Sequence, residues 1–136
     1  MPALRYPYHN IEQVRHALAL LPEDCKVAIV PARVRGKSGY RVLTERGFRR
    51  SVRHLWQVET ALRQLLRPRP RIYSPNPSLC SDGFVVYSAV VAITKGQESD
   101  PLLRAGADAP TPLHALCAAY ARAYSDAQRM QEDQIV

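Results

Sequence analysis

Twelve of the nineteen Lys and Arg residues in this 136-residue chain lie between Arg33 and Arg71. That stretch contains only two acidic residues and carries +10, whereas residues 1–32 are neutral and residues 72–136 carry −3. An arginine side chain can hold a phosphate through two parallel hydrogen bonds, and cations gathered in one stretch favour one face that binds a polyanion. Phosphate binding is therefore the chemistry to look for, and the next question is which elements hold the cations.

The strongest candidate is a helix predicted from about residue 48 to residue 66, where apolar side chains recur at helical spacing. The opposite face of this helix would carry Arg49, Arg50, Arg53, Gln57 and Arg67, with Trp56 on its border. Arginines about one turn apart on a rigid face suit phosphate contacts, and a glutamine can reach base edges. Glu59 falls inside the apolar arc, so we expect it to pair with Arg63 or with a strand arginine.

A β-hairpin is predicted for residues 26–44, with the turn at Gly36-Lys37-Ser38-Gly39. Pro31 cannot donate to a strand ladder, so it indicates an edge strand or a bend. The hairpin and the Pro-rich segment after the helix would extend the basic surface through Arg33, Arg35, Lys37, Arg41, Arg69 and Arg71. The sequence leaves open whether these cations share a face with the helix.

The other elements follow from local patterns. A first helix is predicted over about 11–21, with Asn10 as its N-cap. The prolines within 67–78 predict an extended connection. The apolar, β-branched run 84–93 reads as a strand buried on both faces and therefore central in its sheet. Residues 96–110 are polar with Gly and Pro, which is typical of a surface loop.

A last, long helix is expected after Thr111-Pro112, a strong helix start. The whole chain, 1–136, then forms one α+β domain: a small three- or four-stranded, mainly antiparallel sheet packed against three helices, in the order α-β-β-α-(β)-β-α. We expect an extended N-terminal arm at 1–9 and a frayed C-terminal tail at 131–136.

The sequence shows little evidence of a catalytic site. The segment Cys80-Ser81-Asp82-Gly83 combines nucleophiles with an acid in a loop before a strand, but no surrounding pattern supplies a base. The four histidines lack the spacing of metal ligands. We therefore assign no catalytic, cofactor-binding or metal residues and expect a non-enzymatic protein without a cofactor.

Localisation is read from the cysteines and the apolar runs. Three widely spaced cysteines are not a disulfide framework, so free thiols in a reducing compartment are expected. The N-terminus lacks the apolar segment of a signal peptide, and the longest apolar run is too short to cross a bilayer. These features predict a cytoplasmic protein that does not enter a membrane.

Two functions remain open. The first is a basic nucleic-acid-binding protein that contacts the phosphates of DNA or RNA. The alternative is a small protein-binding inhibitor or accessory protein, of phage or mobile-element type, that acts on a nucleic-acid-handling complex. Its arginines would meet an acidic protein surface, and Trp56 would supply the anchor. Sequence specificity and oligomeric state are not decided by the sequence.

No family is recognised in the chain as a whole. The ending Thr111-Pro112-Leu113, followed by Ala115 and a long helix, is similar to the end of small phage accessory proteins of unknown role. This similarity carries over no residue role and no activity.

Overall fold

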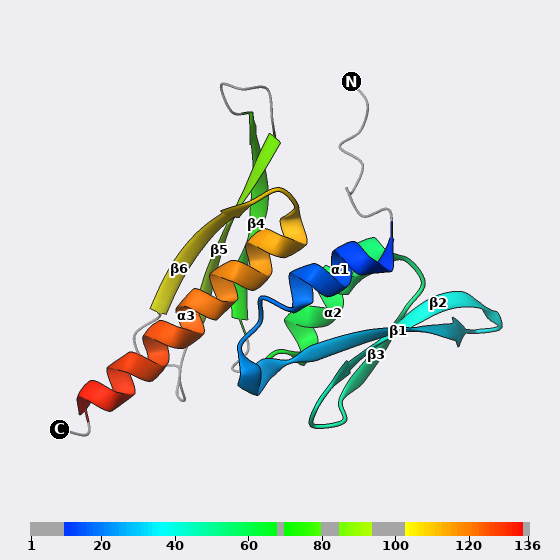
Figure 1. Ribbon diagram of the computed structural model, residues 1–136, viewed down its shortest axis with the longest axis horizontal. Helices are drawn as coiled ribbons and strands as arrows, with labels where there is room; N and C mark the ends of the chain where they lie inside the picture. The colour runs from blue at the N-terminus through cyan, green and yellow to red at the C-terminus, as the bar shows by residue number, and fades with distance from the viewer. Residues whose placement is uncertain (1–9, 68–69, 80–84, 94–102, 135–136) are drawn as a thin grey trace.

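A computed structural model describes residues 10–67, 70–79, 85–93 and 103–134 (Figure 1). Its elements, in chain order, are α1 (Ile11–Leu18), the 3₁₀ turn η1 (Glu23–Cys25), β1 (Val27–Val34), β2 (Lys37–Thr44), β3 (Arg49–Val52), the 3₁₀ turn η2 (Leu55–Gln57), α2 (Val58–Leu65), β4 (Pro70–Leu79), β5 (Val85–Ile93), β6 (Leu103–Ala109) and α3 (Pro112–Gln134). The predicted α+β class, with antiparallel strands packed against three helices, is confirmed.

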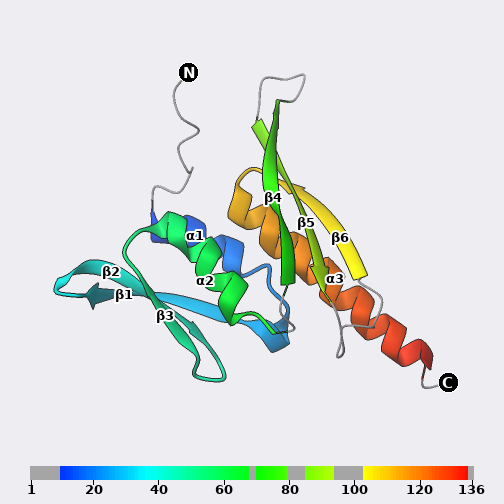
Figure 2. The ribbon, with the colours of Figure 1, turned by 180° about the vertical axis from the view of Figure 1, so that it is seen from behind.

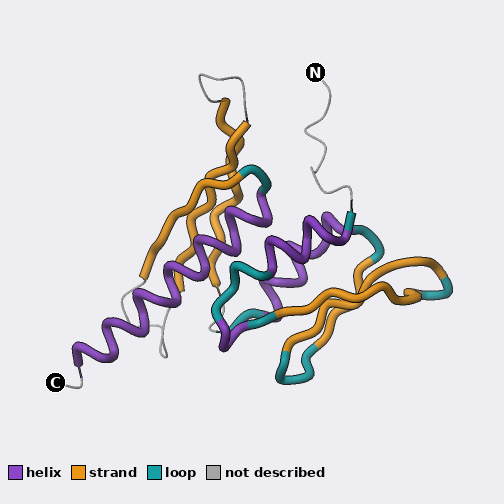
Figure 3. The backbone as a smooth tube through the Cα atoms, viewed as in Figure 1, coloured by secondary structure: helices purple, strands orange, loops and turns teal. Residues whose placement is uncertain are grey.

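The strands form two sheets of three strands each, which we call sheet A (β1-β2-β3) and sheet B (β4-β5-β6). Both are antiparallel meanders, and each is followed by a helix (Figure 3). Compared with the predicted order, β3 and β6 are additional strands. The strand predicted to be central, β5, is the middle strand of sheet B, but the prediction that it is buried on both faces is wrong, because Val90 is 39% exposed and Val86 and Ser88 are half-buried.

The prediction of one helix over residues 48–66 is wrong for its first half. Residues 49–52 form β3, which pairs with β2 so that Arg50 lies opposite Val42. Helix α2 begins only at Val58. The side chain of Gln57 marks the break, because its Oε1 accepts the backbone N–H groups of Arg53, at 2.9 Å, and His54, at 3.0 Å. Pairing with β3 gives partners to the polar groups on the free side of β2, which a helix would leave unpaired.

The apolar face predicted for that helix is wrong at its first residue. Phe48, which was placed on this face, is 59% exposed in the turn before β3. The second half of the helix behaves as predicted. Leu62 is fully buried. Arg63 Nη2 lies 3.2 Å from Glu59 Oε1, so the expected pairing of Glu59 with Arg63 is confirmed.

The expected loop at 96–110 is wrong over residues 103–109, which form β6. This strand is rich in alanine, and Ala107 is buried where α3 packs across sheet B. Small side chains allow the helix and the strand to approach closely. A cross-strand hydrogen bond of 2.5 Å from Ser88 Oγ to Asp108 Oδ1 adds to the pairing of β5 with β6. The extended segment predicted around 67–78 is the strand β4.

The predicted hairpin and the predicted starts of α1 and α3 are confirmed, but the hairpin turn lies at different residues. Strands β1 and β2 pair throughout, and Pro31 lies in β1, an edge strand of sheet A. The turn, however, is made by Arg35 and Gly36, with φ values of 53° and 78°, so Lys37 already belongs to β2. Asn10 Oδ1 caps α1 by accepting the Gln13 N–H at 3.0 Å. The backbone N–H of His114 likewise donates to the hydroxyl oxygen of Thr111 at the start of α3.

One hydrophobic core joins the two sheets through the helices. Helices α1 and α2 cover one face of sheet A, and α3 lies across sheet B beside α1 (Figures 1 and 2). Leu116, Cys117 and Tyr120 of α3 are fully buried in this core. The N-terminal arm at 1–9 lies outside the described residues, and α3 continues through residues 131–134.

Candidate nucleic-acid interface

The two faces of sheet A differ in their side chains. Residues directly opposite each other in antiparallel strands point to the same face, and successive residues alternate. Val27, Ile29 and Val42 are therefore on one face, and all are buried under the helices. We call this the inner face. The opposite, outer face carries the exposed Ala28 and Val30.

The outer face also holds several of the predicted site residues. Lys37, Arg41 and Arg49 all fall on it by register, with Arg41 opposite Val30 and Arg49 opposite Leu43. Arg41 and Arg49 are diagonal neighbours on adjacent strands, close enough for both to meet one ligand. Arg35 projects from the hairpin turn, which extends beyond the ends of α1 and α2 (Figure 1).

Sheet A concentrates the charge of the whole protein. Residues 27–58 contain eight basic residues and one acid, Glu45, which gives +7. This equals the net charge of the entire chain, so the remaining residues are neutral in sum. The structure thus assigns the positive charge to one sheet with its turns.

The cations of sheet A also lack partners within the described residues. Within the described part of the chain, no ion pair or hydrogen bond is made by the side chains of Arg33, Arg35, Lys37, Arg41, Arg49, Arg50 and Arg53. By contrast, Arg15 pairs with Glu12 at 2.6 Å and Lys26 with Glu23 at 3.8 Å. The sheet A cations are therefore open to an external anion.

A second group of predicted residues meets at the other side of β3. Arg50 lies on the inner face at the edge of sheet A, beside a hollow of about 340 Å³ between β3 and α2. Trp56 lines this hollow and is 53% exposed. Thr60 and Gln64 of α2 also line it, and both fall on the polar side of the helix that the sequence predicts.

Other predicted site residues are engaged elsewhere. The amide oxygen of Gln57 caps the start of η2 and is not available for a base edge. Arg67 Nη1 donates to the carbonyls of Gln64 and Leu66, at 2.8 and 2.9 Å, and so closes the end of α2. Arg71 lies on β4, in sheet B. Arg69 is outside the described residues.

The predicted arginine-rich helix face is therefore wrong as a helix. Arg49 and Arg50 are consecutive strand residues and point to opposite faces of sheet A, and Arg53 lies in the connection to η2. The structure brings together Arg35, Lys37, Arg41 and Arg49 on one side. Arg33 shares the inner face with Arg50, but at the far, hairpin end of β1.

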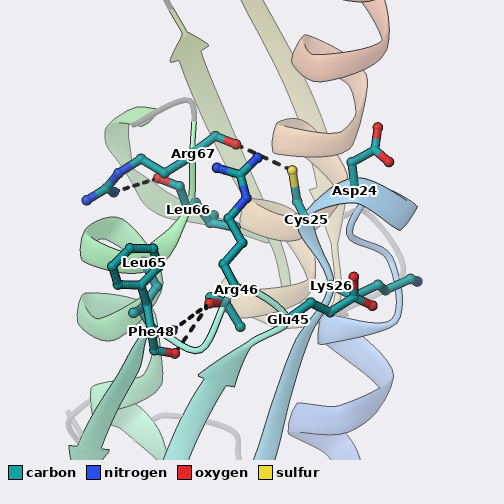
Figure 4. A pocket seen from close by; sticks show the side chains of 10 residues that line it. Asp24, Cys25, Lys26, Glu45, Arg46, Phe48, Leu65, Leu66 and Arg67 are labelled. Carbon is teal, nitrogen blue, oxygen red and sulfur yellow. Dashed lines mark hydrogen bonds between the residues drawn. The ribbon is translucent and has the colours of Figure 1, made fainter.

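A smaller pocket of about 90 Å³ lies where sheet A meets α2, and it was not anticipated (Figure 4). The thiol of Cys25 donates to the carbonyl of Arg67 at 3.5 Å and lies 4.0 Å from the Tyr120 hydroxyl. Partial burial raises the pKa of this thiol, so it is protonated at neutral pH. Arg46 and Phe48 also line the pocket. A protonated thiol that donates to a backbone carbonyl is suited to a structural contact rather than to nucleophilic attack.

Three further sequence predictions concern a reactive loop, metal ligands and membrane-spanning helices. The segment Cys80–Gly83 lies outside the described residues. Within the described ranges, no three His, Cys, Asp or Glu side chains gather closely enough to hold a metal ion. No helix in that same part of the chain combines the length and the apolar character needed to cross a bilayer.

Comparison with family models, with curated proteins and with solved structures finds no match to this chain. The function must therefore be argued from the residues of sheet A and its surroundings.

Proposed function

We propose that this protein binds nucleic acid without catalysing a reaction, and that it contacts phosphates through the outer face of sheet A and the β1–β2 turn. The single observation that carries the proposal is the set of unpaired cations on this sheet. Seven Lys and Arg side chains have no acidic partner within the described residues, although ion pairs occur elsewhere in the molecule. A polyanion would supply the missing counter-charges.

The arrangement of these cations supports a phosphate backbone as the ligand. Arg41 and Arg49 lie on neighbouring strands, and Arg35 and Lys37 extend the row to the hairpin tip. Arginine can hold one phosphate with two parallel hydrogen bonds. Val30 lies opposite Arg41 and Leu43 opposite Arg49 on the same face, where they provide apolar contact with sugars or bases. Free thiols at Cys25 and Cys117 support the expected cytoplasmic location.

The test is a fluorescence-anisotropy titration of mixed short DNA and RNA at about 50 and 200 mM salt, a range over which phosphate contacts lose orders of magnitude in affinity. We expect tight binding at the lower salt. The variant Arg41→Glu/Arg49→Glu should bind at least about a hundred-fold more weakly, because it removes two contacts and adds repulsion. Absence of binding at the lower salt would contradict the proposal.

The matched control is Arg104→Glu/Arg129→Glu, which changes the net charge equally but acts on β6 and α3. It should retain most of the affinity if binding depends on sheet A rather than on total charge. Arg49→Glu/Arg53→Glu tests the contribution of β3 and its following connection. An equal loss in the control and in the sheet A variants would show non-specific attraction only.

A protein partner is the second candidate, and the exposed aromatic side chains favour it. Phe48 and Trp56 are 59% and 53% exposed, and exposed aromatics are frequent anchors of protein interfaces. The partner would be an acidic surface of a nucleic-acid-handling complex, with this chain as its inhibitor or accessory protein. Such an interface should depend only modestly on salt, which separates it from phosphate binding in the same titration.

A further inference from the structure

Three hollows of similar size, about 330 to 340 Å³, lie between a strand at the edge of a sheet and a helix. In two of them an arginine from the helix reaches the free strand edge. Arg15 Nη2 of α1 donates to Ile29 O at 3.4 Å, and Arg122 Nη1 of α3 donates to Gly106 O at 3.0 Å. The third hollow, between β3 and α2, has no such bridge within the described residues.

The third hollow has a different lining. Trp56, Thr60 and Gln64 follow one another at intervals of four residues, so they lie along one side of η2 and α2. Arg50 faces them from β3. The side chains of all four make no hydrogen bond with the described part of the chain. The hollow thus combines an exposed aromatic ring, a hydroxyl, an amide and a guanidinium.

The Trp56 ring is held in place from one side. It lies nearly parallel to the imidazole of His54, with 6.0 Å between the ring centroids and 7° between the planes. His54 is itself positioned by the bond from its backbone N–H to Gln57 Oε1. A ring fixed in this way loses little freedom when a second flat group stacks on it.

We propose that the hollow between β3 and α2 seats one unpaired nucleobase of a single-stranded nucleic acid. The base stacks on Trp56, the Gln64 amide and the Thr60 hydroxyl bond its polar edge, and Arg50 holds the adjacent phosphate. A volume of about 340 Å³ is at the lower end for small-ligand pockets, which suits a single base. A base within a duplex is stacked on its neighbours and cannot enter.

The hollow lies at the same edge strand, β3, that carries Arg49 of the proposed phosphate-binding face, and the inference rests on the proposed function. Arg49 and Arg50 are consecutive residues of the edge strand β3 and point to opposite faces. A backbone that crosses Arg41 and Arg49 on the outer face can pass around this edge. It then reaches Arg50 and delivers one base to Trp56. The ligand class is therefore single-stranded rather than duplex nucleic acid.

The experiment uses Trp56 as a reporter, because it is the only tryptophan in the chain. A labelled mixed-sequence single strand and its duplex are titrated at about 50 mM salt, and label anisotropy and tryptophan fluorescence are recorded together. We expect the single strand to bind at least about ten-fold more tightly than the duplex. Quenching of Trp56 fluorescence should saturate at the same concentration as the anisotropy. An abasic strand of equal length should bind without quenching.

Variants separate stacking from folding. Trp56→Ala should weaken single-strand binding about ten-fold and leave duplex binding unchanged, whereas Trp56→Phe should retain most of the affinity. Leu20→Ala is the control. It removes another exposed apolar side chain, which follows α1 and does not line the hollow, and it should have no effect. Gln64→Ala, at an exposed helix position, should weaken binding less than Trp56→Ala.

The outcomes distinguish the two proposals. If no nucleic acid binds at low salt, both are wrong. If strands bind but Trp56 fluorescence is unchanged, or if Trp56→Ala binds the single strand as the native protein does, the base-binding hollow is wrong and the phosphate-binding face stands. Equal affinity for single strand and duplex would also overturn the hollow.

Discussion

Sheet A and sheet B are both three-stranded antiparallel meanders followed by a helix, yet they present different surfaces. In sheet A the outer face carries unpaired arginines, and the middle strand contains Arg41 between Tyr40 and Val42. In sheet B the middle strand β5 is apolar over most of its length and packs against α3. Each sheet therefore contributes one face to the core. The other face of sheet B exposes Val90, Arg104 and Asp108, whereas that of sheet A carries the unpaired arginines.

The strand arginines of sheet A differ from the helix arginines that reach the sheets. Arg122 of α3 donates to the Gly106 carbonyl of sheet B, and Arg15 of α1 donates to the Ile29 carbonyl of sheet A. On sheet A, the arginines of β2 and β3 are left without an internal partner in the described residues. Gathering like charges on one small sheet costs stability through repulsion. The proposed binding of a polyanion to sheet A would account for this cost.

The largest expected effect is on the shared core. Leu116→Ala removes a fully buried side chain of α3 and should lower the free energy of unfolding by about 2–5 kcal/mol. Because one core cluster joins both sheets, their amides should lose protection together. Urea unfolding with hydrogen exchange measures both effects. Loss of protection in sheet B alone would show that the sheets unfold independently.

The next effect is confined to sheet A. A Cβ at Gly39 would lie 2.8 Å from the Val52 carbonyl oxygen and 2.8 Å from Val34 Cγ2. Gly39→Ala must therefore push β2 away from β3 and should cost about 1–3 kcal/mol, together with a loss of nucleic-acid affinity. Gly36→Asn is the control, because nothing lies near its Cβ and asparagine tolerates positive φ. Native stability in Gly39→Ala would contradict this packing.

Alkaline pH should lower the stability through the buried Cys117 thiol of α3, and the Cys25 thiol, whose pKa is also raised, adds a loss of the same sign. Burial raises the pKa of the Cys117 thiol far above its ordinary value of 9.0. Above that value the unfolded chain loses the proton and the folded chain keeps it, so stability is complete below pH 9 and falls as the pH rises. At pH 10 the loss from this one thiol should be about 1.4 kcal/mol.

Urea unfolding between pH 7 and pH 10 measures this effect, with Cys117→Ala as the variant that should flatten the profile. Burial also raises the pKa of Tyr120, which adds a loss of the same sign above pH 10. An identical alkaline loss in Cys117→Ala would mean that this thiol is not its source.

The smallest effect should be on the free energy of unfolding when the arginine in the β1–β2 turn is replaced. Arg35 has a φ of 53°, a conformation that glycine and asparagine adopt more readily. Arg35→Asn should raise the free energy of unfolding by about 0.5–1 kcal/mol and weaken nucleic-acid binding a few-fold. Thermal unfolding and anisotropy report the two opposite changes. A loss of stability would show that the arginine is favourable in this turn.

Local patterns were sufficient for part of the fold. The β1–β2 hairpin, the edge position of Pro31, the central strand β5 and the starts of α1 and α3 were all predicted correctly. Each depends on neighbours in sequence: a turn, a proline, an apolar run or a cap. The pairing of Glu59 with Arg63 followed from helical spacing in the same way.

The sequence by itself determined that the positive charge lies in residues 33–71 and that the chain forms an α+β fold with antiparallel strands. The tertiary structure decided that residues 49–52 are a strand, because the apolar spacing there fits a helix as well and only the free edge of β2 favours pairing. It likewise decided that residues 103–109 form the strand β6. Their small side chains do not indicate a strand by local pattern, and they form one where α3 packs on them. The hollow that joins Arg50 to Trp56 arises because β3 packs beside α2, and no local pattern in the sequence indicates it.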